Sequence, residues 1–356
     1  MSQQFSCAAM ETRVHTVGWK QCVRSLASTR SSRAKSLQSR LRAAAKWSSS
    51  HRVAVRTAAA ASRSRAVLKV GSRGSALATA QARTVVAELP NAELVVVESS
   101  GSPSEDKARW TRSLDQALLD GEIDIAIHSA KDVPGDRPDG IVALGVPKRE
   151  DPRDAICGAI SLEALSEQAR VGTSSPRRAA LIAAFAPQVQ TVDLRGNVDT
   201  RLRKLAEGEC DAAILALAGL RRLGLADKGI ALDPTVFTPA PGQGSLLLEG
   251  RVGDDNVREL GELVSHRESE LALAAERSLV IALGADCHTA VGALAQVEAD
   301  LITLDAICLA PDGATWIRDR ITGPVRDAAA LGRELAKSLR AAGADELLAL
   351  SRGEAS

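Results

Sequence analysis

The chain contains no tyrosine and only three phenylalanines among its 356 residues. Its hydrophobic cores must therefore be built from Leu, Ile, Val and Ala. No apolar run reaches the ~18 residues that a membrane-spanning helix needs, so we expect no membrane association. Hydrophobic residues make up 45% of the chain, which predicts two or three domains with well-formed cores.

Metal-binding cysteine patterns are also missing. The six cysteines form no CxxC pair and no zinc-ligand spacing, so we predict no metal site. Two of them lie within the first 66 residues, and the other four are scattered singly, as is typical of a reducing compartment. These four are Cys157, Cys210, Cys287 and Cys308.

Acidic residues are nearly absent from residues 1–66, which hold 13 Lys or Arg, 13 Ser and a single acid, Glu11. Residues 67–356 hold 32 of the chain's 45 basic residues and 43 of its 44 acidic residues, a net charge of −11. An Arg-rich, Ser-rich and acid-poor leader predicts an organelle transit peptide, so that the folded protein begins near Val67. A basic nucleic-acid-binding arm is the alternative. The acidic remainder offers no second basic face, so we expect no nucleic-acid partner.

The stretch from Ile123 to Pro134 places a polar cluster directly after a hydrophobic strand. Apolar and other residues alternate through Ile127, which is the period of a β-strand. The polar residues that follow are His128, Ser129, Lys131 and Asp132. Open α/β sheets carry their ligand sites at the carboxyl ends of strands, so Asp132 is the candidate catalytic carboxylate. The alternative is that Asp132 caps a turn and Lys131 is solvated.

A strand, a small polar turn and a helix follow one another repeatedly, which predicts α/β lobes with mainly parallel sheets. The first unit has a strand at 67–70, a turn at 71–75 and a helix at 76–88. The later units occupy 170–178, 191–201 and 211–222. We expect the charged segment 148–154 and the loop 239–244 to connect two such lobes. The polar segment 99–109 predicts a mobile loop.

The last part of the chain has a different pattern. It predicts a helix followed by three strands and a final helix, an order that is typical of a small α+β domain with an antiparallel sheet. The expected elements are a helix at 256–283, strands at 291–298, 301–309 and 315–321, and a helix at 325–342. Cys287 lies on the loop between the first helix and the first strand. A cysteine on a loop is a nucleophile or a covalent tether, and a plain buried thiol is the alternative.

Six arginines follow the predicted strands of the two lobes. They are Arg73, Arg177, Arg178, Arg195, Arg201 and Arg222. In two lobes that face each other, such turns converge on one cleft, and converging guanidinium groups predict a small ligand with several carboxylates or phosphates. Scattered surface ion pairs are the alternative for each single arginine.

These stretches together resemble the porphobilinogen deaminase (hydroxymethylbilane synthase) family from Val67 nearly to the end. Seven matching stretches stand in the family's order: GSRGSALATAQA, IDIAIHSAKDVP, KREDPRDA, VGTSSPRR, VDLRGNVDTRL, ILALAGLRRLGL and PAPGQG. The resemblance implies two lobes like those of periplasmic binding proteins, formed by residues 67–148 with about 240–262 and by 149–239. It implies a third, α+β domain at 263–356 that carries the cofactor cysteine.

The resemblance also implies the reaction, in which four porphobilinogen units are condensed head to tail into hydroxymethylbilane with release of ammonia. A dipyrromethane cofactor, joined to Cys287 by a thioether, primes the chain. Asp132 matches the catalytic carboxylate. The residues that match cofactor-binding positions are Arg73, Ser75, Lys131, Asp132, Ser174, Arg177, Arg178, Arg195 and Gly196. Those that match substrate-binding positions are Arg73, Lys107, Arg195, Arg201 and Arg222.

Further expectations follow from the same resemblance. Arg149 and Arg153 match the segment between the lobes, where they bind ligand or act at a hinge. The family's place in photosynthetic eukaryotes favours the plastid stroma as the destination of residues 1–66, with the mitochondrion as the alternative, and we expect a monomer. Two other functions stay open: a carboxylate-binding protein without catalysis, and an inactive paralogue that holds tetrapyrroles.

Overall fold

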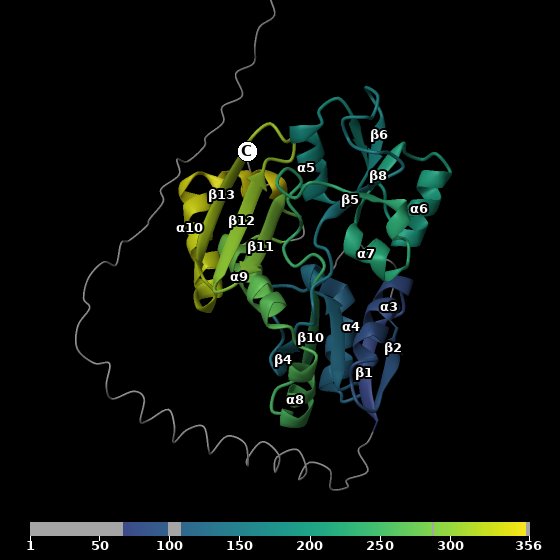
Figure 1. Cartoon of the computed structure of the whole chain (residues 1–356), viewed down its shortest axis with the longest axis vertical. Helices are drawn as coiled ribbons and strands as arrows, with labels where there is room; N and C mark the ends of the chain where they lie inside the picture. Colours follow the sequence, from purple (N-terminus) through teal and green to yellow (C-terminus); the bar gives the residue numbers. More distant parts are fainter. Residues whose placement is uncertain (1–66, 99–107, 287, 354–356) are drawn as a thin grey trace, which may run out of the picture. The chain divides into compact units, whose positions relative to one another are not determined.

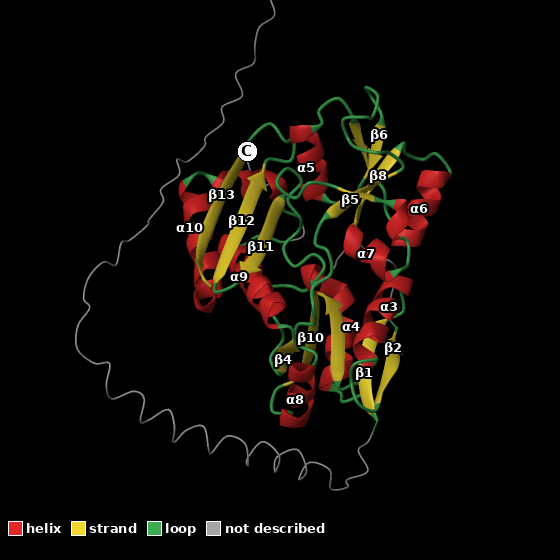
Figure 2. Ribbon diagram, in the orientation of Figure 1, coloured by secondary structure: helices red, strands yellow, loops and turns green. Residues whose placement is uncertain are grey.

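The computed structural model describes residues 67–98, 108–286 and 288–353. The predicted transit peptide, most of the predicted mobile loop at 99–109, Lys107 and Cys287 lie outside these ranges. Three sheets organise the described residues (Figures 1 and 2). Within those residues, none of the helices combines the length and the apolar character that crossing a membrane requires.

The first sheet has five strands in the order β2-β1-β3-β10-β4. Their bounds are β1 Leu68–Arg73, β2 Ala92–Val97, β3 Ile125–Ser129, β4 Ile141–Gly145 and β10 Leu246–Arg251. Strand β1 is parallel to β2 and β3, whereas β10 is antiparallel to both of its neighbours, β3 and β4. Four strands therefore run in one direction, as predicted, and β10 alone runs in the other.

The second sheet repeats this arrangement in the order β7-β6-β8-β5-β9. Its strands are β5 Asp154–Cys157, β6 Arg170–Gly172, β7 Gln190–Val192, β8 Ala212–Ala216 and β9 Ile230–Ala231. Here β5 is the single reversed strand, antiparallel to β8 and β9. The reversed strand in each sheet is the first one after the chain has crossed from the other sheet. The predicted α/β class with mainly parallel sheets is confirmed.

The helices that follow these strands carry the predicted turns. They are α3 Ala76–Val86, α4 Ala108–Leu119, α5 Pro176–Phe185, α6 Val198–Ala206 and α7 Leu217–Arg222. Two of them begin at serine caps, because the Ser75 hydroxyl accepts from Ala78 N and the Ser175 hydroxyl accepts from Arg178 N. The strands themselves are apolar: Val70, Ile125 and Ile214 are fully buried.

The third sheet is antiparallel, in the order β11-β12-β13. Its strands are Val291–Glu298, Leu301–Leu309 and Trp316–Pro324, close to the predicted bounds. Helices α9 Arg267–Leu283, α10 Ala328–Ala341 and α11 Ala344–Arg352 form one core with it. A Cβ at Gly332 of α10 would stand 2.3 Å from the Ala275 carbonyl oxygen of α9, so only glycine allows these two helices to approach so closely. The predicted α+β architecture is present.

The prediction of a single helix at 256–283 is wrong. The chain instead forms α8 Asp255–Leu263 and a separate α9 that begins at Arg267. The break is made by hydrogen bonds to the end of β4: Val146 N donates to the Ser265 hydroxyl (2.8 Å) and His266 N donates to Val146 O (2.8 Å). The His266 side chain then caps α9 by accepting from Ser269 N. These are long-range contacts, so the helical periodicity of the sequence does not reveal the break.

Candidate functional site

The turn that carries Asp132 is the short 3-10 helix η1, Ala130–Asp132, at the carboxyl end of β3. The amide of Ala130 donates to Ser245 O at 3.0 Å. On the far side of the turn, Arg277 of α9 donates to Val133 O (3.1 Å) and Pro134 O (2.9 Å). The half-buried Asp132 is therefore held between the first sheet and α9, as a candidate catalytic group must be if its position is to be fixed.

A small pocket opens beside Asp132. Its lining consists of Arg73, Ala78, Gln81, Ile127, His128, Ser129 and Asp132. Arg73 ends β1, and Gln81 comes from α3, where its amide oxygen lies 3.2 Å from the Ser129 hydroxyl. The structure thus brings together two residues that the sequence placed in separate motifs, the cation Arg73 and the carboxylate Asp132. A site with these two charges can bind an anionic group and an N–H donor side by side.

His128 stays uncharged in this pocket. Burial is the main cause that lowers the pKa of His128 to about 3. The charges of Arg137 and Arg73 act in the same direction, and Asp132 opposes them. Since the neutral ring adds no charge, Arg73 and Asp132 set the electrostatics of the pocket lining.

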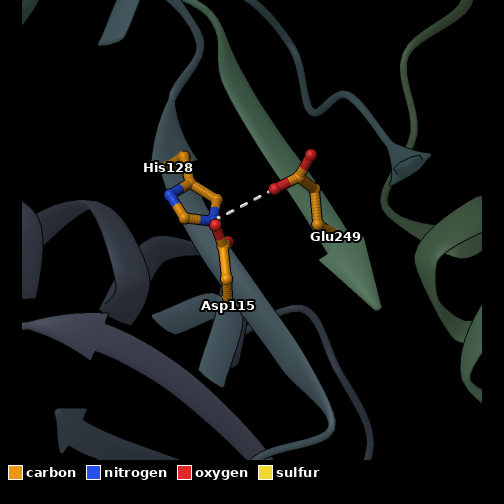
Figure 3. Close-up of side chains that lie close together, drawn as sticks. All are labelled: Asp115, His128 and Glu249. Carbon is orange, nitrogen blue, oxygen red and sulfur yellow. Dashed lines mark ion pairs between the residues drawn. The ribbon is translucent and has the colours of Figure 1, made fainter. Parts of the chain in front are cut away.

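Behind His128 lies a buried ion-pair network that sequence reasoning missed. Figure 3 shows His128, Asp115 and Glu249, with His128 Nε2 3.2 Å from Glu249 Oε2. Three acid and imidazole side chains so close together could hold a metal ion. Here Arg137 supplies the positive charge instead, because it donates to both carboxylates, at 2.6 Å to Asp115 Oδ1 and 2.5 Å to Glu249 Oε2. The network ties the segment after Asp132 to α4 and β10.

Arg201 and Ser174 lie together in the second lobe. Arg201 donates from Nε to Gly196 O (2.8 Å) and from Nη2 to the Ser174 hydroxyl (3.2 Å). Burial, followed by the charge of Arg178, lowers the pKa of Arg201 to about 10, while Asp193 and Asp132 raise it. The residue therefore remains a cation at neutral pH and feels the charge of Asp132.

Arg195 is more exposed than Arg201. Its Nε donates to Asp193 Oδ2 at 2.6 Å, and more than half of the side chain is accessible to solvent. An exposed pair of this kind contributes at most about 1 kcal/mol to stability. Gly196, the next residue, offers its carbonyl to Arg201.

Arg177 and Arg178 do not present their charges to an open surface. Both are at least 95% buried and pair with Asp154, the first residue of β5. Arg178 reaches Asp154 Oδ1 at 2.7 Å, and Arg177 reaches Oδ2 at 2.8 Å. Burial alone would raise the pKa of Asp154, but the two guanidinium groups and a hydrogen bond from Gln243 outweigh it and lower the pKa to about 2. Asp154 was not a predicted site residue, although it lies in KREDPRDA.

The remaining predicted arginines hold the crossing segments. Arg222 donates to Gly244 O at 2.7 Å. Arg149 binds the fully buried Glu276 of α9 with both terminal nitrogens, at 2.7 and 3.1 Å. Arg153 donates to the two carboxylate oxygens of Asp151 from Nε (2.9 Å) and Nη2 (2.7 Å). Arg149 and Arg153 thus lie in ion pairs, and their predicted role in ligand binding or at a hinge stays a prediction.

The described residues fit a ligand that carries several carboxylates. Arg73 lines the same pocket as Asp132, Lys131 precedes Asp132 in η1, and Arg201 feels the charge of Asp132. Arg201 is half-buried, and a guanidinium that is partly removed from water binds a carboxylate more strongly than a fully hydrated one does. Asp132 in turn can accept hydrogen bonds from ring N–H groups. A dipyrromethane with acidic side chains has both kinds of group.

Comparisons with known proteins agree over most of the chain. Residues 68–259 match the family model "Porphobilinogen deaminase, dipyromethane cofactor binding domain", and residues 271–341 match "Porphobilinogen deaminase, C-terminal domain".

Three curated bacterial relatives carry the name porphobilinogen deaminase. That of Thermus thermophilus is 45% identical over 299 residues, covering 80% of this chain and 99% of the relative. Those of Deinococcus radiodurans and a Caulobacter species are 40% and 41% identical and cover 78% and 80% of this chain, and 97% and 99% of the relatives. Among solved structures, R. palustris Rpa4515 with adipate is 14% identical with a TM-score of 0.41, covering 80% of this chain and 97% of that one.

Proposed function

The chain belongs to the porphobilinogen deaminase family, and we propose that it joins four porphobilinogen units head to tail into hydroxymethylbilane, releasing one ammonia per unit. It is then a transferase of tetrapyrrole biosynthesis. The observation that carries the proposal is the half-buried Asp132 in a pocket with Arg73. The charge of Asp132 also acts on Arg201 of the second lobe. A carboxylate among cations suits a substrate that has both acidic side chains and a ring that becomes positive.

Asp132 is the residue that we assign to catalysis. When ammonia leaves a porphobilinogen unit, positive charge develops on the pyrrole ring, and a fixed carboxylate stabilises this charge and binds the ring N–H. The η1 turn fixes the position of Asp132, because Ala130 N donates to Ser245 O and Arg277 donates to Val133 O and Pro134 O.

Dipyrromethane, when bound, supplies the end of the chain to which the first substrate unit is joined. We propose that Cys287, outside the described residues, holds it through a thioether. Its carboxylates and those of the growing chain would be bound by the predicted set, of which Arg73, Ser75, Lys131, Ser174, Arg195, Gly196, Arg201 and Arg222 are described. In the described structure Arg177 and Arg178 point inward and pair with Asp154. We therefore propose that they support the site by holding Asp154.

The decisive experiment compares Asp132→Asn with Asp136→Asn in purified, cofactor-loaded protein. Asn keeps the shape of Asp132 and removes its charge, so turnover of porphobilinogen should fall roughly 10²–10⁴-fold. Asp136 lies four residues further on and is exposed, so its variant should match the unaltered protein. Near-normal turnover of a folded Asp132→Asn protein would move the catalytic role elsewhere. A chain that binds pyrroles but never turns over porphobilinogen would be a binding protein or an inactive paralogue.

Location, domain limits and assembly form a second set of proposals. We propose that residues 1–66 direct import into a plastid, which a fluorescent protein fused to residues 1–66 tests; cytosolic fluorescence would contradict it. The proposed domains are 67–148 with about 240–262, then 149–239, then 263–356. Supporting them, β1–β4 and β10 share one sheet, β5–β9 a second and β11–β13 a third. We propose a monomer, which light scattering of the purified protein tests.

A further inference from the structure

The loop at 239–244, the last of the matching stretches, carries a buried glutamine, Gln243, that contacts both sheets' ligand-side residues. Gln243 is 1% exposed and lies between the Asp132 turn and the buried Asp154 cluster. Its amide oxygen accepts from Lys131 Nζ at 3.2 Å. Its amide nitrogen donates to Asp154 Oδ1 at 2.9 Å and to Pro152 O at 2.8 Å. One side chain thus contacts a residue of η1, the interlobe residue Pro152 and the first residue of β5.

The orientation of this amide is set by its neighbours. A backbone carbonyl and an ionised carboxylate only accept hydrogen bonds, so Pro152 O and Asp154 require the NH₂ group. An ammonium only donates, so Lys131 requires the oxygen. Asp154 is ionised because its pKa lies at about 2. Glutamine is the one residue of this length that meets both requirements at neutral pH. Glutamate would face Asp154 with a second negative charge, and methionine would make neither contact.

The backbone around Gln243 is also held from several directions. Arg149 Nε donates to Gln243 O at 2.9 Å, and Arg222 donates to Gly244 O at 2.7 Å. The amide of Gly242 donates to Glu276 Oε2 at 2.6 Å. Because the backbone of this loop is fixed, the Gln243 side chain can hold Lys131 in place. Lys131 immediately precedes Asp132 in the same helical turn, so a fixed Lys131 also restricts Asp132.

We propose that Gln243 is a positioning residue, which holds Lys131 and the Asp132 turn in register with the Asp154, Arg177 and Arg178 cluster of the second lobe. The inference rests on the proposed function, because it assigns the turn its catalytic role. In this arrangement Asp154 fixes the orientation of the neutral Gln243 amide, and the amide in turn fixes Lys131 in the catalytic turn. Proton transfer is not involved.

The experiment measures kcat and KM for porphobilinogen with Gln243→Met and Gln243→Glu, each loaded with cofactor. Gln243→Met loses the contacts to both Lys131 and Asp154, and Gln243→Glu loses the donation to Asp154 and places a second negative charge beside it, so kcat should fall about 10- to 100-fold in each. KM should change little, because Gln243 does not line the pocket beside Asp132. Ser269→Ala is the matched control: it removes a buried hydroxyl that accepts from Arg149 N in the same junction and does not touch η1. Its kcat should stay within about twofold of the unaltered protein.

The pH dependence separates positioning from simple space filling. When protonated, the glutamic acid of Gln243→Glu can again donate to Asp154 and accept from Lys131. The ratio of its kcat to that of Gln243→Met should therefore rise as pH is lowered. Equal activity of both variants at every pH, or a folded Gln243→Met within about twofold of the unaltered protein, would overturn the inference. If Gln243→Met does not fold, the test is the ratio of kcat for Gln243→Glu to kcat for the unaltered protein. The inference expects this ratio to rise as pH is lowered, and a ratio that does not change with pH would overturn it.

Failure of this inference can be told from failure of the proposed function. If the unaltered protein turns over porphobilinogen, Asp132→Asn is inactive and the Gln243 variants are normal, only the positioning role is lost. If the unaltered, cofactor-loaded protein does not turn over porphobilinogen, the proposed function itself is wrong.

Discussion

Replacing Asp154 with asparagine should destabilise the fold strongly. The carboxylate is fully buried, pairs with Arg177, and accepts hydrogen bonds from Arg178 and Gln243. Asparagine keeps the shape but leaves two buried guanidinium groups without their counter-charge. Removing one partner of a buried ion pair costs about 3–5 kcal/mol. The folded-state pKa of about 2, against the ordinary 3.8, independently implies about 2 kcal/mol from the charge alone.

Chemical denaturation at several pH values tests this magnitude and its sign. Because folding depresses the pKa of Asp154, its contribution is fully present above pH 3.8 and is lost as pH falls towards 2. The difference in unfolding free energy between the unaltered protein and Asp154→Asn should therefore shrink over that window. Asp211→Asn is the matched control, since Asp211 pairs with Arg170 at the surface, where water screens the pair, and its loss should cost much less. Equal costs for the two variants, or a difference that does not change with pH, would refute the reasoning.

Two further predictions concern the site. Arg201→Ala should impair cofactor loading or chain elongation, because it strips a charge-assisted contact worth about 1.5–3 kcal/mol from a ligand carboxylate, whereas Arg203→Ala, at an exposed position of the same helix, should load and elongate normally. Cofactor colour with Ehrlich reagent and product formation check both, and normal loading and elongation by Arg201→Ala would make that arginine structural. The pKa of His128 is lowered from 6.5 to about 3, so its stabilising contribution is present above pH 6.5 and is lost as pH falls towards 3. His128→Asn should therefore weaken the acid dependence of unfolding in that window, and an unchanged dependence would show that His128 titrates normally.

The sequence predicted the elements whose signals are local. The alternation of Ile123, Ile125 and Ile127 and the polar cluster after them placed a strand end and Asp132 correctly at the first sheet. The turn with Ser75 and Arg73 was likewise found from small residues before a helix. In these stretches the period of the side chains and the capping chemistry act within a few residues, so they can be read without the fold.

What the sequence did not reveal depends on contacts between distant residues. Arg177 and Arg178 follow a strand, which predicts that they line a cleft. In the structure both form ion pairs with the buried Asp154, which lies 24 residues before Arg178. Arg137 joins carboxylates that lie 22 and 112 positions from it. The reversed strand β10 was missed because only its pairing with β3 and β4 distinguishes it from a buried loop. The residues next to each partner in the sequence do not indicate which distant residue it will contact.

The central claim, a chain-building transferase primed on a cysteine, is tested most directly by intact-protein mass spectrometry. The active protein should be heavier than its sequence by two linked pyrrole units, and the extra mass should map to the peptide that contains Cys287. The Cys287→Ser protein should lack this mass and should not turn over porphobilinogen. Cys157, Cys210 and Cys308 are buried, so their peptides should carry no adduct. A fully active protein whose Cys287 peptide has its unmodified mass would contradict the account.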